Sequence, residues 1–116
     1  MNKIKGDEMR EIEIDDLLGG SSPFTQNADA RKTFPVYSGF VKYFPDAMAK
    51  IAHISWLGNE QHHPGTPLHW DRSKSADESD AMMRHLIDYT KSGDIEELTK
   101  VVWRAMAWLQ KVAECE

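Results

Sequence analysis

The strongest constraint on the fold is an apolar stripe in the last quarter of the chain. Its members recur three or four residues apart over two and a half heptads: Ile95, Leu98, Val102, Ala105, Leu109 and Val112. This spacing places them on one face of an α-helix. Asp94 and Glu97 match a capping box, which predicts that the helix begins at Asp94. Val101, Met106 and Trp108 widen the stripe, so we expect this helix to contact two neighbours.

An earlier helix is expected from Pro45 and Asp46. Proline suits a first helical turn, and an acidic residue suits the positive end of the helix dipole. We expect the helix to stop at Gly58-Asn59, since these residues are typical of a helix end. Residues 58–76 would then form a polar connection that holds three of the five histidines. Connections of this length in small domains are often functional.

A helix from about Asp77 to Lys91 is expected to follow this connection. Ser75 and Glu78 match a second capping box, and Gly93 suits a left-handed position at the end of the helix. The three predicted helices indicate an all-α fold, a small bundle with no strands.

The chain before the first of these helices is expected to be irregular. Residues 1–30 contain a Gly-Gly-Ser-Ser-Pro run and are predicted to form a flexible or partner-ordered arm. Residues 31–43 are rich in aromatic and small side chains, and we expect an extended, partly buried segment there. The domain itself is predicted to span residues 31–116. Three helices give a thin core at this size, so we expect a homo-oligomer to complete the bundle.

Charge and composition limit the partners. The chain has 19 acidic and 14 basic residues and a net charge of −5, which argues against binding to a nucleic-acid backbone. No apolar run approaches the ~20 residues that span a bilayer, and residues 1–16 lack the apolar region of a secretory signal. The single Cys115 excludes a disulfide framework and a cysteine-rich zinc site. We expect a cytoplasmic protein with no membrane partner.

Several catalytic signatures are missing from the sequence. It has no GxxxxGK[ST] phosphate loop, no GxGxxG, no GxSxG and no HExxH. What remains is a set of carboxylates and imidazoles near the predicted helix ends. Hard cations prefer oxygen ligands, so converging helices could hold Mg²⁺ or Mn²⁺ between four carboxylates: Glu60, Asp80, Asp94 and Glu97. Arg84 and Lys100 would then meet phosphate, and Trp70 could cover a nucleobase.

Each of these residues also has a plainer interpretation. Asp94, Glu97 and the Ser75–Glu78 pair would be helix caps. Asp80 and Arg84, four residues apart, would form a surface ion pair of little energetic weight. His62 and His63 would belong to a solvated loop, and His85 would be a core histidine with satisfied hydrogen bonds. The residues alone leave both interpretations open.

The order of several short motifs resembles a known family. They are Arg31-Lys32, Phe44-Pro45, Trp56-Leu57-Gly58, Leu68-His69-Trp70, Asp80-Ala81-Met82-Met83-Arg84-His85-Leu86 and Gly93-Asp94. Over about residues 30–110 the chain resembles the N-terminal domain of phage dATP/dGTP diphosphohydrolases, a domain similar to MazG-type enzymes. The most specific piece is the segment from Asp80 to Leu86.

The resemblance implies an all-α fold and a metal-assisted reaction. A purine deoxynucleoside triphosphate would be split into monophosphate and pyrophosphate. By position, Arg84 and His85 match the family's Arg-His pair, Trp70 matches its Asn-Trp tryptophan and Asp94 matches a later aspartate. We therefore expect catalytic roles for Glu60, Asp80 and His85. Substrate binding is expected from four residues: Arg84, Trp70, Lys100 and His62.

The chain also departs from the family. The region where the family places histidines reads Glu97-Leu98-Thr99-Lys100, and the paired EExxE and ExxD motifs of MazG-type enzymes are absent. A second hypothesis is therefore a non-catalytic phage protein that sequesters a nucleotide signal or binds a host protein. A third is a structural role without a ligand. Within a phage-infected cell, the expected location is the host cytoplasm.

Overall fold

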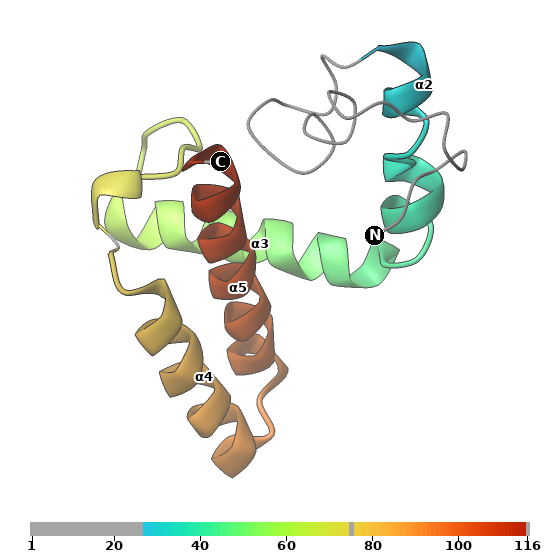
Figure 1. Cartoon of the computed structure of the whole chain (residues 1–116). Helices are drawn as coiled ribbons and strands as arrows, with labels where there is room; N and C mark the ends of the chain where they lie inside the picture. Colours follow the sequence, from blue (N-terminus) through green and yellow to red (C-terminus); the bar gives the residue numbers. More distant parts are fainter. Residues whose placement is uncertain (1–26, 75, 116) are drawn as a thin grey trace. The chain divides into compact units, whose positions relative to one another are not determined.

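The computed structural model describes residues 27–74 and 76–115, and every regular element in these ranges is a helix. The expected all-α fold is confirmed (Figure 1). The chain divides into two compact units. One holds Phe44–Leu109, and the other holds the described residues on either side of it. No helix in the described ranges is both long and apolar enough to cross a membrane.

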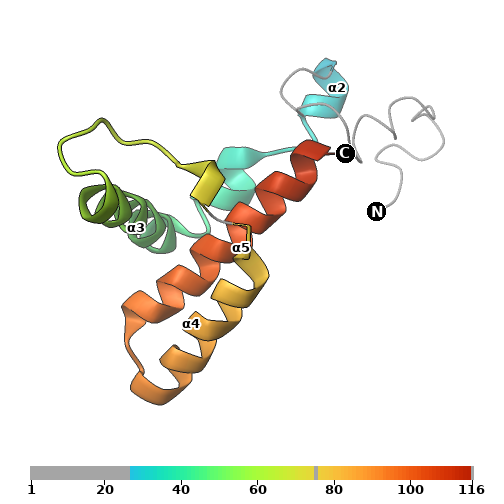
Figure 2. The ribbon, with the colours of Figure 1, turned by 90° about the vertical axis from the view of Figure 1, so that its left-hand side faces the viewer.

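The unit Phe44–Leu109 contains the three main helices. They are α3 (Pro45–His62), α4 (Glu78–Ser92) and the greater part of α5 (Ile95–Cys115). α4 and α5 form an antiparallel hairpin, and α3 crosses α5 rather than running beside it (Figures 1 and 2). A loop with one 3-10 turn, η4 (Arg72–Lys74), connects α3 to α4.

α3 continues past the predicted stop at Gly58-Asn59, so that prediction was wrong. The main chain keeps its helical hydrogen bonds, and the N–H of His63 still donates to the carbonyl oxygen of Asn59 at 2.7 Å. The helix ends at His62, and His63 leaves the helical conformation with φ −141° and ψ 57°. Pro64 explains this position, because the residue before a proline is disfavoured in the helical region.

The hairpin follows the sequence prediction at its turn and at the Asp94 cap, and departs from it at Glu97 and at the start of α4. Gly93 takes the left-handed conformation with φ 70°, as predicted. Asp94 accepts a hydrogen bond from the N–H of Glu96 at 3.0 Å, so it does cap α5. The carboxylate of Glu97 is hydrogen-bonded to His85 at 2.8 Å. Asp77 precedes the first residue of α4 without a side-chain cap, and Ser75 lies outside the described residues.

The expected extended segment over residues 31–43 is not found. A short helix, α2 (Ala28–Arg31), is capped by Asn27, whose side chain accepts from the N–H of Ala30 at 2.9 Å. A π-helical turn, η3 (Tyr37–Val41), follows. Pro35 has its φ preset near the helical value, and its carbonyl oxygen accepts from Gly39 N–H at 2.7 Å, which favours a turn over a strand.

This segment is also more exposed than expected. Tyr37 is 66% exposed and Tyr43 is 70% exposed, so the aromatic residues do not form a partly buried strand. Of the predicted arm, residues 1–26 lie outside the described part of the chain, and residues 27–30 begin the α2 turn.

Little of the hydrophobic surface is buried. Among the described residues no large side chain is fully buried, and the buried apolar residues are Ala30, Ala81 and Ala107. Polar contacts join the helices instead. Arg104 on α5 is paired with Glu78 on α4 at 2.9 Å, and Trp103 Nε1 donates to Ser55 Oγ on α3 at 2.8 Å. The thin core that the length of the chain predicted is therefore present.

Substitutions at two glycines test whether α3 continues through Gly58 and whether α4 ends at Gly93. An added methyl group would meet nothing within 4 Å at either Gly58 or Gly93, so only the backbone conformation distinguishes them. We expect G58A to raise the free energy of unfolding by about 0.5–1 kcal/mol, since alanine favours a helix interior. We expect G93A to lower it by about 1 kcal/mol, because the left-handed conformation penalises Cβ. Urea unfolding followed by circular dichroism measures both, and a loss of stability in G58A would contradict a helix through Gly58.

Candidate functional site

A cavity of about 720 Å³ lies within the Phe44–Leu109 unit. The C-terminal half of α3, the loop after it, the middle of α4 and the first three turns of α5 contribute its walls. Its polar and charged lining residues are Ser55, Asn59, Gln61, His62, His63, His69, Asp71, Asp77, His85, Glu96, Lys100 and Arg104. The remaining lining residues are Ile54, Leu57, Gly58, Leu68, Trp70 and Trp103. Its volume lies within the ~300–1,000 Å³ of small-molecule sites, and most of its lining residues are polar or charged.

Two tryptophans form the aromatic part of the wall. Trp70 from the loop meets Trp103 from α5 edge to face, with ring centroids 5.7 Å apart. The guanidinium of Arg72 lies 4.4 Å from the Trp70 ring centre, a cation–π geometry. The bond from Trp103 Nε1 to Ser55 fixes the second ring against α3. Trp70 is therefore held between Trp103 of α5 and Arg72 of the 3-10 turn η4.

Histidines hold the same loop. His63 Nε2 lies 3.5 Å from Asp71 Oδ2, and its ring is 4.8 Å from the ring of His69. His69 Nδ1 is 3.0 Å from the carbonyl oxygen of Pro67. The His63–Asp71 contact joins the two ends of the loop.

Asn59 is the most buried polar side chain of the wall. It is 5% exposed, and its Nδ2 donates to the carbonyl oxygen of Thr66 at 3.1 Å. This bond fixes the orientation of the amide, so that the other end must be the oxygen. Oδ1 is buried and has no hydrogen-bond partner in the structure. A buried acceptor without a donor costs about 1–3 kcal/mol, which a ligand or a water that reaches it would recover.

The charges of the wall are nearly balanced and mostly paired. Lys100 Nζ lies 3.3 Å from Glu96 and 3.6 Å from Glu97, and Arg104 is paired with Glu78. Asp77 accepts a hydrogen bond from Arg84 at 3.1 Å, and this bond lowers the pKa of Asp77. An anionic ligand would therefore have to compete with these acidic partners for Lys100.

The α4–α5 hairpin brings together one group of possible metal ligands. His85, Asp88 and Glu97 each offer a ligand atom, and these atoms all lie within 4.8 Å of one another. His85 Nδ1 and Glu97 Oε1 are 2.8 Å apart. The hydrogen bond from His85, followed by the charge of Lys100, lowers the pKa of Glu97. Imidazole with two carboxylates suits Mn²⁺ or Zn²⁺ better than Mg²⁺, which prefers oxygen alone.

The structure brings four of the predicted site residues into the cavity wall. These are His62, Trp70, His85 and Lys100, which come from α3, the loop, α4 and α5. Five others do not line it: Glu60, Asp80, Arg84, Asp94 and Glu97. Arg84 pairs with Asp77, not with Asp80 as the four-residue spacing suggested.

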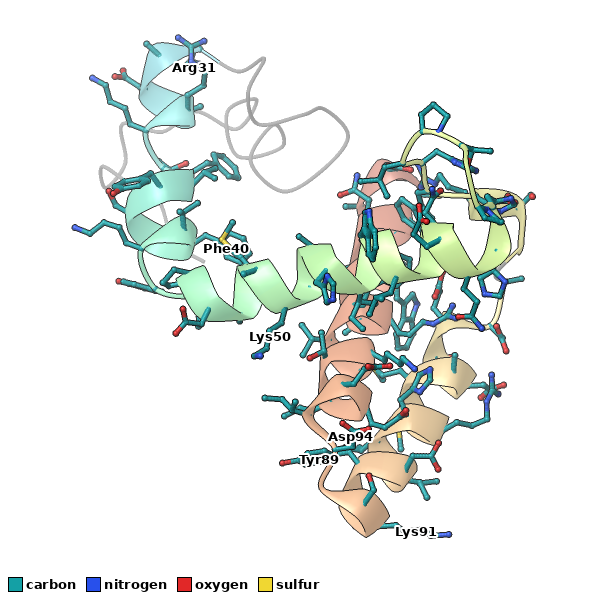
Figure 3. The ribbon with its side chains drawn as sticks, turned by 180° about the vertical axis from the view of Figure 1, so that it is seen from behind. Arg31, Phe40, Lys50, Tyr89, Lys91 and Asp94 are labelled. Atoms are coloured by element: carbon teal, nitrogen blue, oxygen red, sulfur yellow. The ribbon has the colours of Figure 1, made fainter. Side chains whose placement is uncertain are left out.

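The expected cluster of four carboxylates does not form. Asp80 lies in the first turn of α4, and Asp94 follows the last residue of that helix. The rise of 1.5 Å per residue separates them by roughly 18 Å along the axis, so they cannot share one ion. Figure 3 shows Asp94 with Tyr89 and Lys91 at the turn where α4 meets α5. Glu97 is the one member of the expected cluster found in the ligand group of the described residues.

Sequence reasoning missed four residues of this region: Asn59, Asp88, Trp103 and Arg104. Two of them carried a readable signal. Glu96, Lys100, Trp103 and Arg104 recur at helical spacing on the side of α5 away from the apolar stripe, which indicates a second, polar contact face. Asn59 carried no such signal, because the predicted helix stop at Gly58-Asn59 placed it in a loop.

No protein-family model matches the chain, and the comparisons with characterised proteins and with solved structures find no match either. Function must therefore be argued from the cavity and its residues.

The His85–Glu97 contact predicts a dependence of stability on pH. The pKa of Glu97 is lowered from 4.5 in the folded chain, so its contribution is complete above pH 4.5 and is lost as the pH falls through the folded value. We expect E97Q to be less stable than the wild type at pH 7 and the difference to shrink towards pH 3. Urea midpoints across this range measure it, with E60Q as a control for the loss of one charge. A difference that stays constant with pH would contradict the assignment.

Proposed function

We propose that the chain binds a purine nucleoside triphosphate in the cavity of the Phe44–Leu109 unit. One observation carries the proposal. Three of the four residues expected to bind substrate, together with His85, come from four separate segments and line a single cavity. The proposed reaction is that of a phage-type pyrophosphohydrolase, in which water adds to the α-phosphorus and the α–β phosphoanhydride bond breaks. The products are a monophosphate and pyrophosphate.

The aromatic part of the wall suits the base. Trp70 is held by Arg72 and Trp103, and a tryptophan ring fixed in this way can stack on a purine with little loss of side-chain entropy. Asn59 adds a buried acceptor, which an amino group of the base could satisfy once the wall adjusts to the ligand. Both adenine and guanine carry such an amino group, so these contacts favour purines without choosing between them.

The phosphates would meet the α5 side of the wall. Lys100 lies there, with His85 one helix away on α4. The acidic partners Glu96 and Glu97 reduce the net positive charge on this side, so Lys100 alone would not balance a triphosphate. A divalent cation would supply the missing charge.

The residues present fit such a cation, which we propose is Mn²⁺ or, less well matched, Mg²⁺. His85, Asp88 and Glu97 would hold it, at the edge of the cavity that His85 also lines. When bound, the ion would neutralise phosphate charge and lower the pKa of a water molecule. The catalytic roles expected for Glu60 and Asp80 remain predictions from the sequence.

The alternative is binding without hydrolysis. The described residues gather three ligand groups, whereas the reaction as MazG-type enzymes perform it would use carboxylate pairs on facing helices. Incubation with each ribo- and deoxynucleoside triphosphate and Mn²⁺, followed by ion-exchange chromatography, separates the two. Monophosphate and pyrophosphate from a purine nucleotide support the enzyme, and intact nucleotide retained on the protein supports sequestration. If no nucleotide is either hydrolysed or retained, the proposal is wrong and the chain has a role that does not involve a nucleotide.

We also propose what the chain binds. A purine nucleotide is the proposed ligand, and further copies of this chain are the proposed protein partner.

Substitution of the loop tryptophan tests the base contact. We expect W70A to weaken binding of dATP and dGTP by roughly 5- to 150-fold, because a base loses its stacking surface, worth about 1–3 kcal/mol. W56A is the matched control, since Trp56 is half-exposed on α3 and does not line the cavity. Isothermal titration calorimetry in the presence of Mn²⁺ measures both. Equal affinities of the two variants would place the nucleotide elsewhere.

Two aspartates of α4 test the metal site. Asp80 and Asp88 are both exposed, and only Asp88 belongs to the ligand group. We expect D88N to weaken Mn²⁺ binding at least tenfold and D80N to leave it within about twofold, since losing a charged ligand removes both a bond and its attraction. Electron paramagnetic resonance of free Mn²⁺, without nucleotide, measures the affinity. A larger effect of D80N than of D88N would contradict this metal site and favour Asp80 as a ligand, as the sequence predicted.

A further inference from the structure

Two histidines lie against each other in the loop that follows α3. His63 comes directly after the last residue of the helix, and His69 directly precedes Trp70. Their ring centroids are 4.8 Å apart, with the ring planes inclined at 51°. Both residues line the cavity, and neither belongs to the ligand group of His85. The proposed contacts with a nucleotide do not use this pair.

The loop is built so that the chain turns back over the end of α3. Thr66 N–H donates to the carbonyl oxygen of His63 at 3.2 Å, and Gly65 between them has φ 82°. Proline in the second position of a turn and glycine in the third are typical of a type II turn, and Pro64 and Gly65 supply them. Asn59 Nδ2 donates to the carbonyl oxygen of Thr66, which ties the turn to the helix. The approach of the two rings therefore has a structural cause in the turn.

The separation of the rings fits two imidazoles that share one metal ion. A ring nitrogen lies about 1.1 Å from the ring centre and about 2.0–2.1 Å from a bound Zn²⁺, so the ion would lie about 3.2 Å from each centroid. Two such rings would have centroids about 4.5 Å apart for a right angle at the ion and about 5.2 Å apart for a tetrahedral angle. The observed 4.8 Å lies between these values. Packed rings can also lie this close, so the outer partners of the two rings carry the rest of the argument.

Each ring has an acceptor on one of its two nitrogens. His69 Nδ1 lies 3.0 Å from the carbonyl oxygen of Pro67. A carbonyl oxygen can only accept, so it holds the proton on Nδ1 and leaves the lone pair on Nε2. His63 Nε2 lies 3.5 Å from Asp71 Oδ2, and this carboxylate favours a proton on Nε2 and a lone pair on Nδ1. A backbone carbonyl or a carboxylate on the second nitrogen is the usual arrangement around a histidine that binds a metal.

We propose that His63 and His69 bind one Zn²⁺ ion, His63 through Nδ1 and His69 through Nε2. Imidazole suits Zn²⁺, whereas Mg²⁺ and Ca²⁺ prefer oxygen ligands. Asp71 and the carbonyl oxygen of Pro67 would be the outer partners that orient the rings. Water, or oxygen atoms of a molecule in the cavity, would complete the coordination. The ion would close the loop immediately before Trp70 and so restrict the position of that ring.

This site is independent of the proposed function. It rests on the loop after α3, and the nucleotide plays no role in it, so the test uses the full chain with Zn²⁺ alone. Failure of nucleotide binding would leave the zinc result unchanged. Failure of zinc binding would leave the proposed nucleotide contacts unchanged.

The test measures the affinity for Zn²⁺ by competition with a chromogenic chelator. It is made in the D88N chain, because the ligand group of His85 could also hold zinc. We expect this chain to bind one Zn²⁺ ion, and the further change H69N to weaken binding by more than about tenfold, because the ion loses one of its two protein ligands. We expect D71N to weaken it by about 10- to 100-fold, since that is the usual effect of removing an outer partner.

The matched control is H53N in the same D88N chain. His53 is exposed on α3 and does not line the cavity, so the change should leave the affinity within about twofold. Equal affinities of the H69N and H53N chains would overturn the proposal. So would a D88N chain that binds no zinc.

A second measurement needs no change in the loop and therefore covers variants whose loop folds differently. X-ray absorption at the zinc edge is recorded for the D88N chain with one equivalent of Zn²⁺. We expect the spectrum to show two imidazole rings, with zinc–nitrogen distances of about 2.0–2.1 Å. A single imidazole would place the ion at His85 and overturn the proposal.

Discussion

A nearly buried ion pair joins α4 to α5. The side chain of Glu78 is 5% exposed, and Arg104 Nη1 lies 2.9 Å from its carboxylate. Removing either partner would leave a buried charge without compensation, which typically costs about 3–5 kcal/mol. The contacts that follow depend on this pair. The guanidinium of Arg104 lies 5.7 Å from the ring of Trp103, which is bonded to Ser55 on α3 and touches Trp70 of the loop. One ion pair thus begins a series of contacts that joins all three helices and the loop.

The same contacts shape the candidate site. A core of interlocked leucines would have filled the space between α3 and the hairpin, whereas polar bridges at the edges hold the helices apart and leave a cavity of about 720 Å³. The groups that build the walls are therefore the groups that a ligand would meet. Lys100 and His85 illustrate this double use, because each already has a carboxylate partner and each lies in the wall. An anionic ligand that binds there would have to displace these carboxylate partners.

Much of the fold could be predicted from the sequence, and less of the site. The helical spacing from Ile95 to Val112 and the turn at Gly93 have local causes, and both are found. The predicted end of α3 was wrong, because the contacts of Asn59 outweigh the weak helix propensity of Gly58-Asn59.

The expected carboxylate cluster does not form for a geometric reason, since the length of α4 separates Asp80 from Asp94. His85 and Lys100, both predicted site residues, line the cavity, and each is also paired with a carboxylate. Asp88 was missed, since its spacing from His85 gains meaning only when Glu97 of α5 is placed beside them.

The scarcity of fully buried large side chains has a thermodynamic consequence. Unfolding raises the heat capacity mainly by exposing apolar surface, at about +0.45 cal/K/mol for each Å², while polar exposure lowers it. The buried apolar residues of the described chain are three alanines, so exposing apolar surface raises its heat capacity of unfolding only a little. Its stability curve would be broad and shallow, with small enthalpy changes on warming or cooling, and its resistance to cold would owe more to ion pairs and hydrogen bonds than to the release of water from apolar surface.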